Sequence, residues 1–144
     1  MNLDIVLPRW RELQVAARGV RDRAWAPYSG FRVGAAVLTA DGTITTGCNV
    51  ENASYGLTTC AERVAVCSAI AQGHSGFSAI CISLNSSPIP CGACRQFLIE
   101  FNPEMLVLLD DVNLVADQPP EAVRLSTLLP RAFRLRSDPH GDPP

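Results

Sequence analysis

Apolar residues recur every three or four positions in the first part of the chain. The positions that carry this stripe are Trp10, Leu13, Ala17, Val20 and Ala24. Such spacing places them on one face of an α-helix, with polar residues on the opposite face. Proline suits the first turn of a helix, and Pro8 lies just before the stripe. The pattern predicts an amphipathic helix over about residues 8–26.

A β-hairpin is predicted after this helix. Segments 31–39 and 43–49 are rich in apolar and β-branched residues, and the dipeptide Asp41-Gly42 lies between them. Asp-Gly readily adopts the positive φ angles of a tight two-residue turn, so the two segments are expected to pair as antiparallel strands.

Helical and strand patterns alternate through the next part of the chain. Residues 59–72 are alanine-rich and end at Gly73, which is typical of a helix with a C-terminal glycine cap. The pattern predicts a buried strand over 77–84 and a short helix over 90–101. Residues 105–109 are wholly apolar, as in a strand inside a covered sheet.

The order of these elements predicts the fold class. A last strand or helix is expected within 124–133, and the alternation of strands and helices favours a three-layer α/β/α sandwich around a mixed sheet. No internal repeat and no linker divides the chain, so residues 1–135 are expected to form one domain. The tail 136–144 is rich in proline and is expected to be disordered.

Composition and charge exclude several classes of function. The 144 residues include 12 basic and 14 acidic residues, and the net charge of −2 offers no basic surface for nucleic acid. The longest strictly apolar run, 105–109, is far shorter than the roughly 18 residues of a membrane-spanning helix. The N-terminus does not resemble a signal peptide, so a cytoplasmic protein without a membrane partner is expected. Six cysteines in a reducing compartment indicate metal ligands, catalytic thiols or small buried side chains.

Three cysteines lie where predicted helices begin. Cys60 precedes one helix, and Cys91 and Cys94 begin the next in the order Pro-Cys-Gly-Ala-Cys. Helix N-termini carry unpaired N–H groups and a partial positive charge, which favour the thiolate form that binds metal. Three ligands leave the fourth tetrahedral position open, as in catalytic zinc sites. Small buried side chains are expected of the other cysteines, Cys48, Cys67 and Cys81.

Three other interpretations of these residues remain open at this point. The Cys-x-x-Cys pair alone is typical of a thioredoxin-like redox site. A fourth ligand, Cys48 or His74, would make a structural zinc site. The spacing Thr59-x-x-Glu62 also matches a capping box, in which the glutamate only satisfies a backbone donor.

Glu62 follows Cys60 by two residues at the predicted first turn of a helix. There a cysteine can point off the helix end toward a metal while the glutamate flanks the same cavity. Zinc deaminases combine three Cys or His ligands with a glutamate that is not a ligand and with a Pro-Cys-x-x-Cys element. This arrangement favours Glu62 as a general acid and base beside zinc, and Arg63 as a cation that offsets the thiolate charge.

Five ordered motifs carry a resemblance to a known family. They are Tyr28-Ser-Gly-Phe31-Arg-Val-Gly-Ala-Ala36, Gly47-Cys-Asn49-Val-Glu51-Asn-Ala53-Ser-Tyr55-Gly56, Thr59-Cys60-Ala-Glu62-Arg63, Pro90-Cys91-Gly-Ala-Cys94-Arg-Gln96 and Leu128-Leu-Pro-Arg-Ala-Phe133. In these motifs the chain resembles the cytidine deaminase family, in its small homotetrameric form that acts on free nucleosides. The resemblance covers most of the chain, from the first of these motifs to the last.

The resemblance implies roles for individual residues. It makes Cys60, Cys91 and Cys94 the ligands of one Zn²⁺ per chain. It makes Glu62 the catalytic proton shuttle. The residues that it places at the substrate are Phe31 at the base, Asn49 and Glu51 at the ribose 3′-hydroxyl, Ala53 and Tyr55 at the sugar across a subunit interface, Ala61, and Phe133 on the base in a neighbouring subunit's site. The implied homotetramer would therefore complete its active sites across subunit interfaces.

The resemblance also narrows the substrate. Family members that act on nucleic acids or on deoxycytidylate usually have histidine in place of Cys60. Related blasticidin deaminases are expected to lack the Asn-x-Glu-Asn element that begins at Asn49. The implied reaction is zinc-dependent hydrolysis of cytidine and 2′-deoxycytidine to uridine and 2′-deoxyuridine, with release of ammonia, in pyrimidine salvage. A dithiol oxidoreductase and a non-enzymatic zinc-binding module are the alternatives from other classes.

Overall fold

The computed structural model describes residues 1–135. In chain order the elements are α1 (Leu3–Val6), α2 (Trp10–Arg21), β1 (Gly34–Thr39), β2 (Ile44–Cys48), the 3₁₀ helix η1 (Tyr55–Leu57), α3 (Ala61–Ala71), β3 (Phe77–Leu84), α4 (Gly92–Ile99), β4 (Leu106–Asp111), β5 (Glu121–Arg124) and α5 (Leu125–Leu128). The tail 136–144, which the sequence predicts to be disordered, lies outside the described residues.

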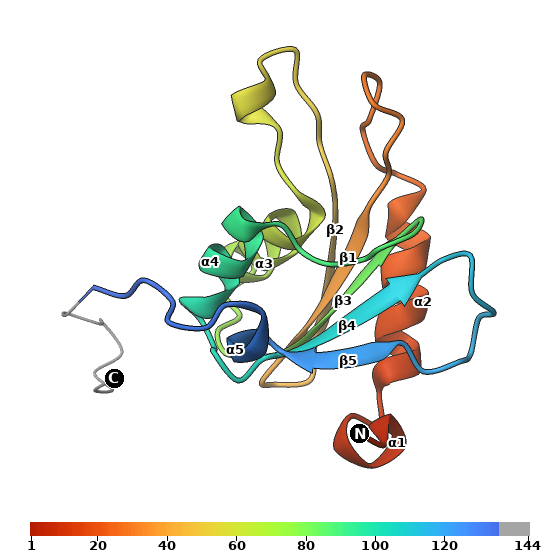
Figure 1. Ribbon diagram of the computed structural model, residues 1–144, viewed down its shortest axis with the longest axis vertical. Coiled ribbons are helices and arrows are strands. Elements are labelled where there is room, and N and C mark those ends of the chain that lie inside the picture. Colours follow the sequence, from red (N-terminus) through yellow and green to blue (C-terminus); the bar gives the residue numbers. More distant parts are fainter. Residues whose placement is uncertain (136–144) are drawn as a thin grey trace.

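One sheet contains the five strands in the order β2-β1-β3-β4-β5 (Figure 1). β1 pairs antiparallel with β2 and with β3, and β4 pairs antiparallel with β5. β3 and β4 run parallel, so the chain must cross over between them, and α4 lies in this connection. The mixed sheet agrees with the predicted fold class.

Helices cover both faces of the sheet. α1 and α2 pack on one face, where the buried side chains include Trp10 and Leu13. α3, α4 and α5 pack on the other face, and Figure 1 shows α3 and α4 across the sheet from α2. β3 contributes to both layers, because Ile80 and Ile82 pack in the α3 layer whereas Cys81 packs in the α2 layer. The three-layer α/β/α sandwich is confirmed.

Two glycines allow the helices to approach the sheet closely. A Cβ atom on Gly34 would lie 2.0 Å from the backbone oxygen of Ala17 in α2. A Cβ atom on Gly47 would lie 2.3 Å from the backbone nitrogen of Ala65 in α3. A larger residue at either position would therefore have to displace helix backbone. Gly47 in this way sets the position of α3, which begins next to Cys60.

The hairpin between β1 and β2 has a three-residue loop rather than the predicted two-residue turn. The N–H of Thr39 donates to the carbonyl of Thr43, and Gly42 adopts φ +87°. This is the hairpin type that combines a type I turn with one left-handed residue. The Asp41 carboxylate accepts from the Thr39 hydroxyl at 2.6 Å and from the Thr43 N–H at 3.0 Å, and so stabilises the loop.

The other predicted elements are present. β3 has the predicted bounds, β4 ends two residues later than predicted, and the rest are shorter than predicted. α2 ends at Arg21 rather than near residue 26, and the chain then turns so that the Trp25 N–H donates to the Asn49 carbonyl at 3.0 Å. Within the predicted range 124–133 the chain forms the helix α5, whereas the strand β5 precedes this range and meets it only at Arg124. α1 and η1 were not predicted, because each is too short to show a period. Within residues 1–135, no helix combines the length and the apolar character that crossing a membrane requires.

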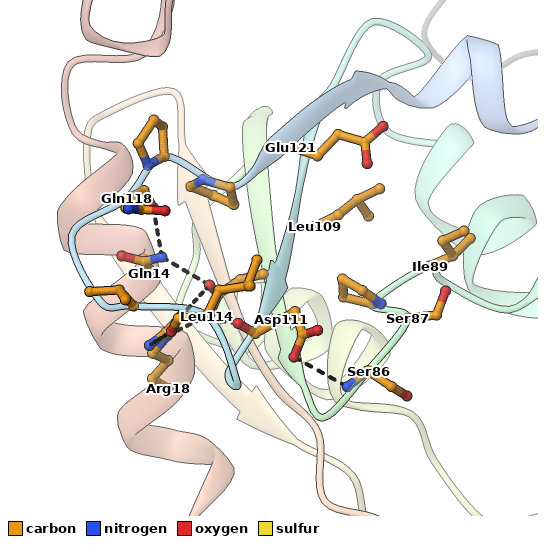
Figure 2. A pocket seen from close by; sticks show the side chains of 15 residues that line it. Gln14, Arg18, Ser86, Ser87, Ile89, Leu109, Asp111, Leu114, Gln118 and Glu121 are labelled. Atoms are coloured by element: carbon orange, nitrogen blue, oxygen red, sulfur yellow. Dashed lines mark hydrogen bonds and ion pairs between the residues drawn. The ribbon is translucent and has the colours of Figure 1, made fainter.

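A buried polar network joins α2 to the carboxyl ends of β3 and β4. The Asp110 carboxylate accepts hydrogen bonds from Gln14 at 2.9 Å, from Arg18 at 2.7 and 2.8 Å, and from Ser83 at 2.6 Å. Figure 2 shows Gln14 and Arg18 beside a cavity of about 250 Å³ that opens here. Because the carboxylate is fully bonded, its burial is tolerated and α2 is held on the sheet.

Candidate metal centre

The sulfur atoms of Cys60, Cys91 and Cys94 form a cluster at the N-terminal ends of α3 and α4. All three atoms lie within 4.8 Å of one another, and the sulfurs of Cys60 and Cys91 are 4.0 Å apart. Tetrahedral Zn–S bonds of about 2.3 Å place two sulfurs about 3.8 Å apart, so the cluster fits one Zn²⁺. Cys60 and Cys91 are the N-cap residues of their helices and have extended backbone angles. Their thiols therefore project past the helix ends.

Within residues 1–135 no fourth protein ligand joins this cluster. His74, one of the two alternatives for a structural site, follows the other end of α3, where its Nδ1 atom lies 2.8 Å from Asp41. Cys48 ends β2 and is not part of the cluster. Three sulfurs with an open fourth position match a catalytic rather than a structural zinc site.

The negative charge of the cluster is centred on Cys60. Hydrogen bonds from the Cys94 thiol and from Arg63, together with the positive charge of Arg63, lower the pKa of Cys60 to about 5. The pKa of Cys94 is raised, because its thiol donates to Cys60 and lies in a buried, negatively charged environment. Cys60 is thus a thiolate at neutral pH, and a bound cation would displace the proton of the Cys94 thiol.

Arg63 lies beside the sulfurs, as the sequence predicts. Its Nη2 atom donates to Cys60 Sγ at 3.6 Å. Arg95, the other arginine next to a ligand, turns elsewhere: its guanidinium donates to the carbonyls of Pro90 at 2.8 Å and Leu128 at 3.0 Å. Arg63 is therefore the cation that offsets the thiolate charge in this structure.

Glu62 is buried in the first turn of α3, with 4% of its surface exposed. Burial and the negative charge of Cys60 raise the pKa of its carboxyl, and they outweigh the hydrogen bond from its own backbone N–H. The capping-box interpretation is wrong, because the N-cap of α3 is Cys60 rather than Thr59. The Thr59 N–H, which a capping box would pair with Glu62, donates instead to the Val50 carbonyl. A backbone role therefore does not account for this carboxyl.

The remaining cysteines differ in exposure. Cys81 is buried in β3, as predicted, and burial raises the pKa of its thiol. Cys48 is half-buried. The prediction that Cys67 is a core residue is wrong, since its side chain is exposed on α3. The core-facing positions of this helix include Ala65 and Ala69, which lie at helical spacing on the opposite side.

Asn49 holds the segment that leads into β1. Its buried side chain accepts from the Val33 N–H and donates to the Phe31 carbonyl, both at 2.8 Å. Each end of the amide keeps one further hydrogen-bonding position, because an amide oxygen accepts two bonds and an NH₂ group donates two. Asn49 therefore positions Phe31 through the backbone.

Glu51 organises the neighbouring loop. Its carboxylate accepts from the Ser29 hydroxyl and from the N–H groups of Tyr28 and Ser29, at 2.9 and 3.2 Å. These bonds lower the pKa of Glu51, and the bond from the Ser29 hydroxyl has the largest effect. This side chain is therefore a carboxylate at neutral pH. Glu51 and Tyr55 line a cavity of about 250 Å³ whose other walls are Tyr28, Ser29, Asn52 and Thr58. Ser29 is a residue of this cavity that sequence reasoning did not single out, although it lies in the first motif.

The aromatic residues expected at the substrate lie on the surface. Tyr55 is 81% exposed, Phe133 is 68% exposed and Phe31 is half-exposed. Figure 1 shows that the segments before β1 and after β2 extend side by side beyond the helices. Ala53 is exposed on the second of these segments, whereas Ala61 is fully buried in the core. The contacts expected of these residues with a substrate stay predictions.

Comparison with known proteins decides the family. A family model for the cytidine and deoxycytidylate deaminase zinc-binding region matches residues 10–109, which include the three clustered cysteines. The cytidine deaminase of Sporosarcina psychrophila is 44% identical over 125 residues, which cover 85% of this chain and 89% of that protein. The chain belongs to the cytidine deaminase family.

Other family members extend the match to the whole fold. A cytidine deaminase of Mycobacterium tuberculosis (strain H37Rv) is 43% identical over 128 residues, covering 88% of this chain and 90% of that protein. The crystal structure of the cytidine deaminase from Burkholderia pseudomallei matches with a TM-score of 0.78 and 45% identity, over 85% of this chain and 97% of that chain. The resemblance seen in the sequence is confirmed, and the protein is an enzyme of the cytidine deaminase class.

Proposed function

We propose that this enzyme hydrolyses cytidine and 2′-deoxycytidine to uridine and 2′-deoxyuridine, with release of ammonia, in pyrimidine salvage in the cytoplasm. The observation that carries this proposal is the position of Glu62, a buried carboxyl two residues from Cys60, beside three sulfurs that fit one Zn²⁺. The cytidine deaminases to which the chain is similar support the substrate class.

Cys60, Cys91 and Cys94 would hold one Zn²⁺ per chain. When bound, zinc acts as a Lewis acid and lowers the pKa of a coordinated water from 15.7 toward about 7. Three thiolates bring three negative charges, and Arg63 offsets part of this charge through its hydrogen bond to Cys60. Without Arg63, the charge of the cysteine ligands would raise the pKa of the coordinated water, and the reaction needs this pKa to be low.

Glu62 has the properties of the proton carrier. Its raised pKa brings the carboxyl closer to neutral pH, where a general acid and base works best. In the proposed reaction it accepts a proton from the attacking water and delivers it to N3 of cytosine. It then carries a second proton to the amino group at C4, which leaves as ammonia.

The sugar pocket uses residues of the two extended segments. The Glu51 carboxylate borders the cavity and would accept from the ribose 3′-hydroxyl. Asn49 would use its remaining amide positions for the same hydroxyl while it holds Phe31 at the base. A contact at the 3′-hydroxyl alone does not distinguish ribose from deoxyribose, so both nucleosides are expected as substrates. Ala61 would support the base side of the pocket.

A homotetramer would complete each active site. Several exposed apolar residues lie on the two extended segments and the C-terminal segment: Trp25, Tyr28, Phe31, Tyr55, Leu57 and Phe133. Exposed apolar side chains that meet in an assembly would be removed from water there, which would stabilise the assembly. In the proposed assembly Ala53 and Tyr55 contact the sugar in an adjacent subunit, and Phe133 stacks on the base there.

A dithiol oxidoreductase is the second candidate, favoured by the Cys91-x-x-Cys94 spacing. It requires an exposed attacking thiol, and Cys91 is exposed at the start of α4. The oxidoreductase hypothesis gives no role to the third sulfur, that of Cys60, or to the buried Glu62. The observations therefore favour the deaminase.

Ammonia release tests the proposal directly. The purified protein is incubated with cytidine, 2′-deoxycytidine or deoxycytidylate, with and without a zinc chelator, and ammonia and uracil products are measured. We expect turnover of both nucleosides that stops in chelator and returns with Zn²⁺. Absence of turnover together with reduction of insulin disulfides would establish the oxidoreductase instead.

A further inference from the structure

The C-terminal segment 128–133 lies against α4 and then leaves the core. Leu128, Leu129 and Ala132 pack against the buried cluster that α3 and α4 share. Phe133, directly after them, is largely exposed. Figure 1 shows the chain passing α4 after α5 and then extending away from the domain. The segment is therefore anchored up to the point where it presents the phenyl ring.

Two side chains of α4 bond to the backbone of this segment at its two ends. Arg95 Nη1 donates to the Leu128 carbonyl at 3.0 Å, and Gln96 Nε2 donates to the Phe133 carbonyl at 3.0 Å. Arg95 also donates through Nε to the carbonyl of Pro90 at 2.8 Å, directly before the first cysteine of the metal loop. One guanidinium thus joins the metal loop to the segment that carries Phe133.

The backbone between these two bonds is held in an unfavourable conformation. Arg131 has φ +54°, in the left-handed region that residues other than glycine rarely occupy. Such a conformation persists only where surrounding contacts hold it. The bonds at Leu128 and Phe133 bracket this residue and provide such contacts.

We infer that Arg95 and Gln96 are positioning residues that fix Phe133 relative to the metal loop of its own chain. The inference rests on the proposed function, in which Phe133 stacks on the base in a neighbouring subunit's site. An aromatic ring that is held in place before substrate arrives loses less conformational entropy on binding. The two side chains thereby couple the metal loop of one subunit to the base pocket of another.

Gln96→Met tests this role in the full-length, zinc-loaded enzyme, because methionine keeps the length of the side chain and removes the donor. We expect KM for cytidine to rise about 3- to 10-fold, as for the loss of one hydrogen bond, with kcat within about twofold. Zinc content and oligomeric mass stay unchanged, and amide hydrogen exchange of residues 128–133 becomes faster. Gln72→Met is the matched control, since Gln72 at the C-cap of α3 makes an exposed bond to Ser68 at 3.0 Å. We expect this variant to leave KM unchanged.

Arg95→Lys tests the link to the metal loop. Lysine keeps the charge but cannot bond two carbonyls with one rigid fork. We expect faster exchange in residues 128–133 together with faster release of zinc to a chelator, whereas Gln96→Met should speed the exchange without changing the release of zinc. Unchanged exchange and unchanged zinc release in Arg95→Lys would overturn the assigned link.

Combination with Phe133→Ala separates the inference from the proposed function. We expect Phe133→Ala to raise KM by about tenfold or more, and Gln96→Met to add nothing in that background. An unchanged KM in Phe133→Ala would remove the stacking role and the inference with it. A raised KM in Phe133→Ala, combined with wild-type KM and exchange in Gln96→Met, would overturn the inference and leave the proposed function intact. A full additional effect of Gln96→Met in the Phe133→Ala background would also overturn it.

Discussion

The guanidinium of Arg63 and the sulfur of Cys60 lie 3.6 Å apart, three residues from each other at the start of α3. This spacing places them on adjacent turns of the same helix face. The contact would provide the charge compensation that a centre with three thiolate ligands requires, and it comes from the helix that carries Cys60 at its N-cap and the buried carboxyl of Glu62.

Replacement of Arg63 by glutamine should weaken the centre. We expect kcat/KM for cytidine to fall about 10- to 100-fold, the range found for residues that bond to metal ligands. The pKa of Cys60 should rise toward the ordinary thiol value, so zinc should be lost to a chelator more readily at pH 6 than at pH 8. Arg23→Gln, at an exposed arginine, is the control. Wild-type activity and zinc retention in Arg63→Gln would show that Arg63 has no such role.

Two cysteine variants should separate metal ligands from other cysteines. Cys91→Ser should reduce zinc from about one per chain to well below that value and abolish activity, because serine is a poor ligand for Zn²⁺. Cys67→Ser, at the exposed cysteine of α3, should keep both. The measurement is zinc content by atomic emission after dialysis. Equal zinc in the two variants would contradict the assignment of the cluster.

Glu62→Gln should retain the fold and the zinc but lose turnover. An amide has the shape of the carboxyl but cannot carry a proton, and general acid–base groups contribute typically 10²- to 10⁴-fold. We expect a loss of about this size or larger in kcat, with unchanged zinc content and circular dichroism. Glu104→Gln, at an exposed glutamate, serves as control. Near-normal kcat in Glu62→Gln would remove the carboxyl from the mechanism.

The bond between Asp110 and Arg18 should make stability depend on pH. Burial alone would raise the pKa of Asp110, but hydrogen bonds from Arg18, Ser83 and Gln14 lower it below the ordinary value. A group whose folded pKa is depressed stabilises the fold above its unfolded pKa, about 3.9, and loses this effect as pH falls through the folded pKa.

Asp110→Asn measures this contribution. We expect the free energy of unfolding of the variant at pH 7 to be about 2–4 kcal/mol lower than that of wild type, because the substitution leaves Arg18 without its charged partner. The difference from wild type should shrink as pH falls below about 4. Urea unfolding of both zinc-loaded proteins at several pH values checks this, and the zinc contribution cancels in the difference. A difference that stays constant from pH 7 to pH 3 would contradict the depressed pKa.

Gly47→Ala should destabilise the fold through backbone contact. The added Cβ would lie 2.3 Å from the backbone nitrogen of Ala65, so α3 must move. We expect a loss of about 1–3 kcal/mol or more and weaker zinc binding, because α3 begins next to Cys60. Gly19→Ala in α2, where a Cβ meets nothing within 4 Å, should instead stabilise by about 0.5–1 kcal/mol. Urea denaturation of both variants, compared with wild type, measures these two opposite changes in the free energy of unfolding.

Local chemistry made much of this molecule predictable. The Asp41-Gly42 dipeptide, the apolar periods and the glycine after α3 each determine the backbone near them, so the elements could be placed from neighbouring residues. The predicted length of the hairpin loop was wrong by one residue, because Asp-Gly suits both two- and three-residue loops. The predicted burial of Cys67 was also wrong. Most residues of α3 are apolar, so the sequence does not show which of its faces is exposed to solvent.

The sequence by itself determined the fold class and the family, and it predicted a site of three cysteines with Glu62 and Arg63, because short motifs at helix starts carry that chemistry. Only the tertiary structure decided that the sulfurs of Cys60 and Cys91 come within 4.0 Å, that Glu62 is buried, and that Gln96 bonds to the backbone of Phe133. These facts depend on how α3 and α4 pack on one face of the sheet. Contacts between residues more than thirty positions apart are set by such packing, and no local pattern encodes them.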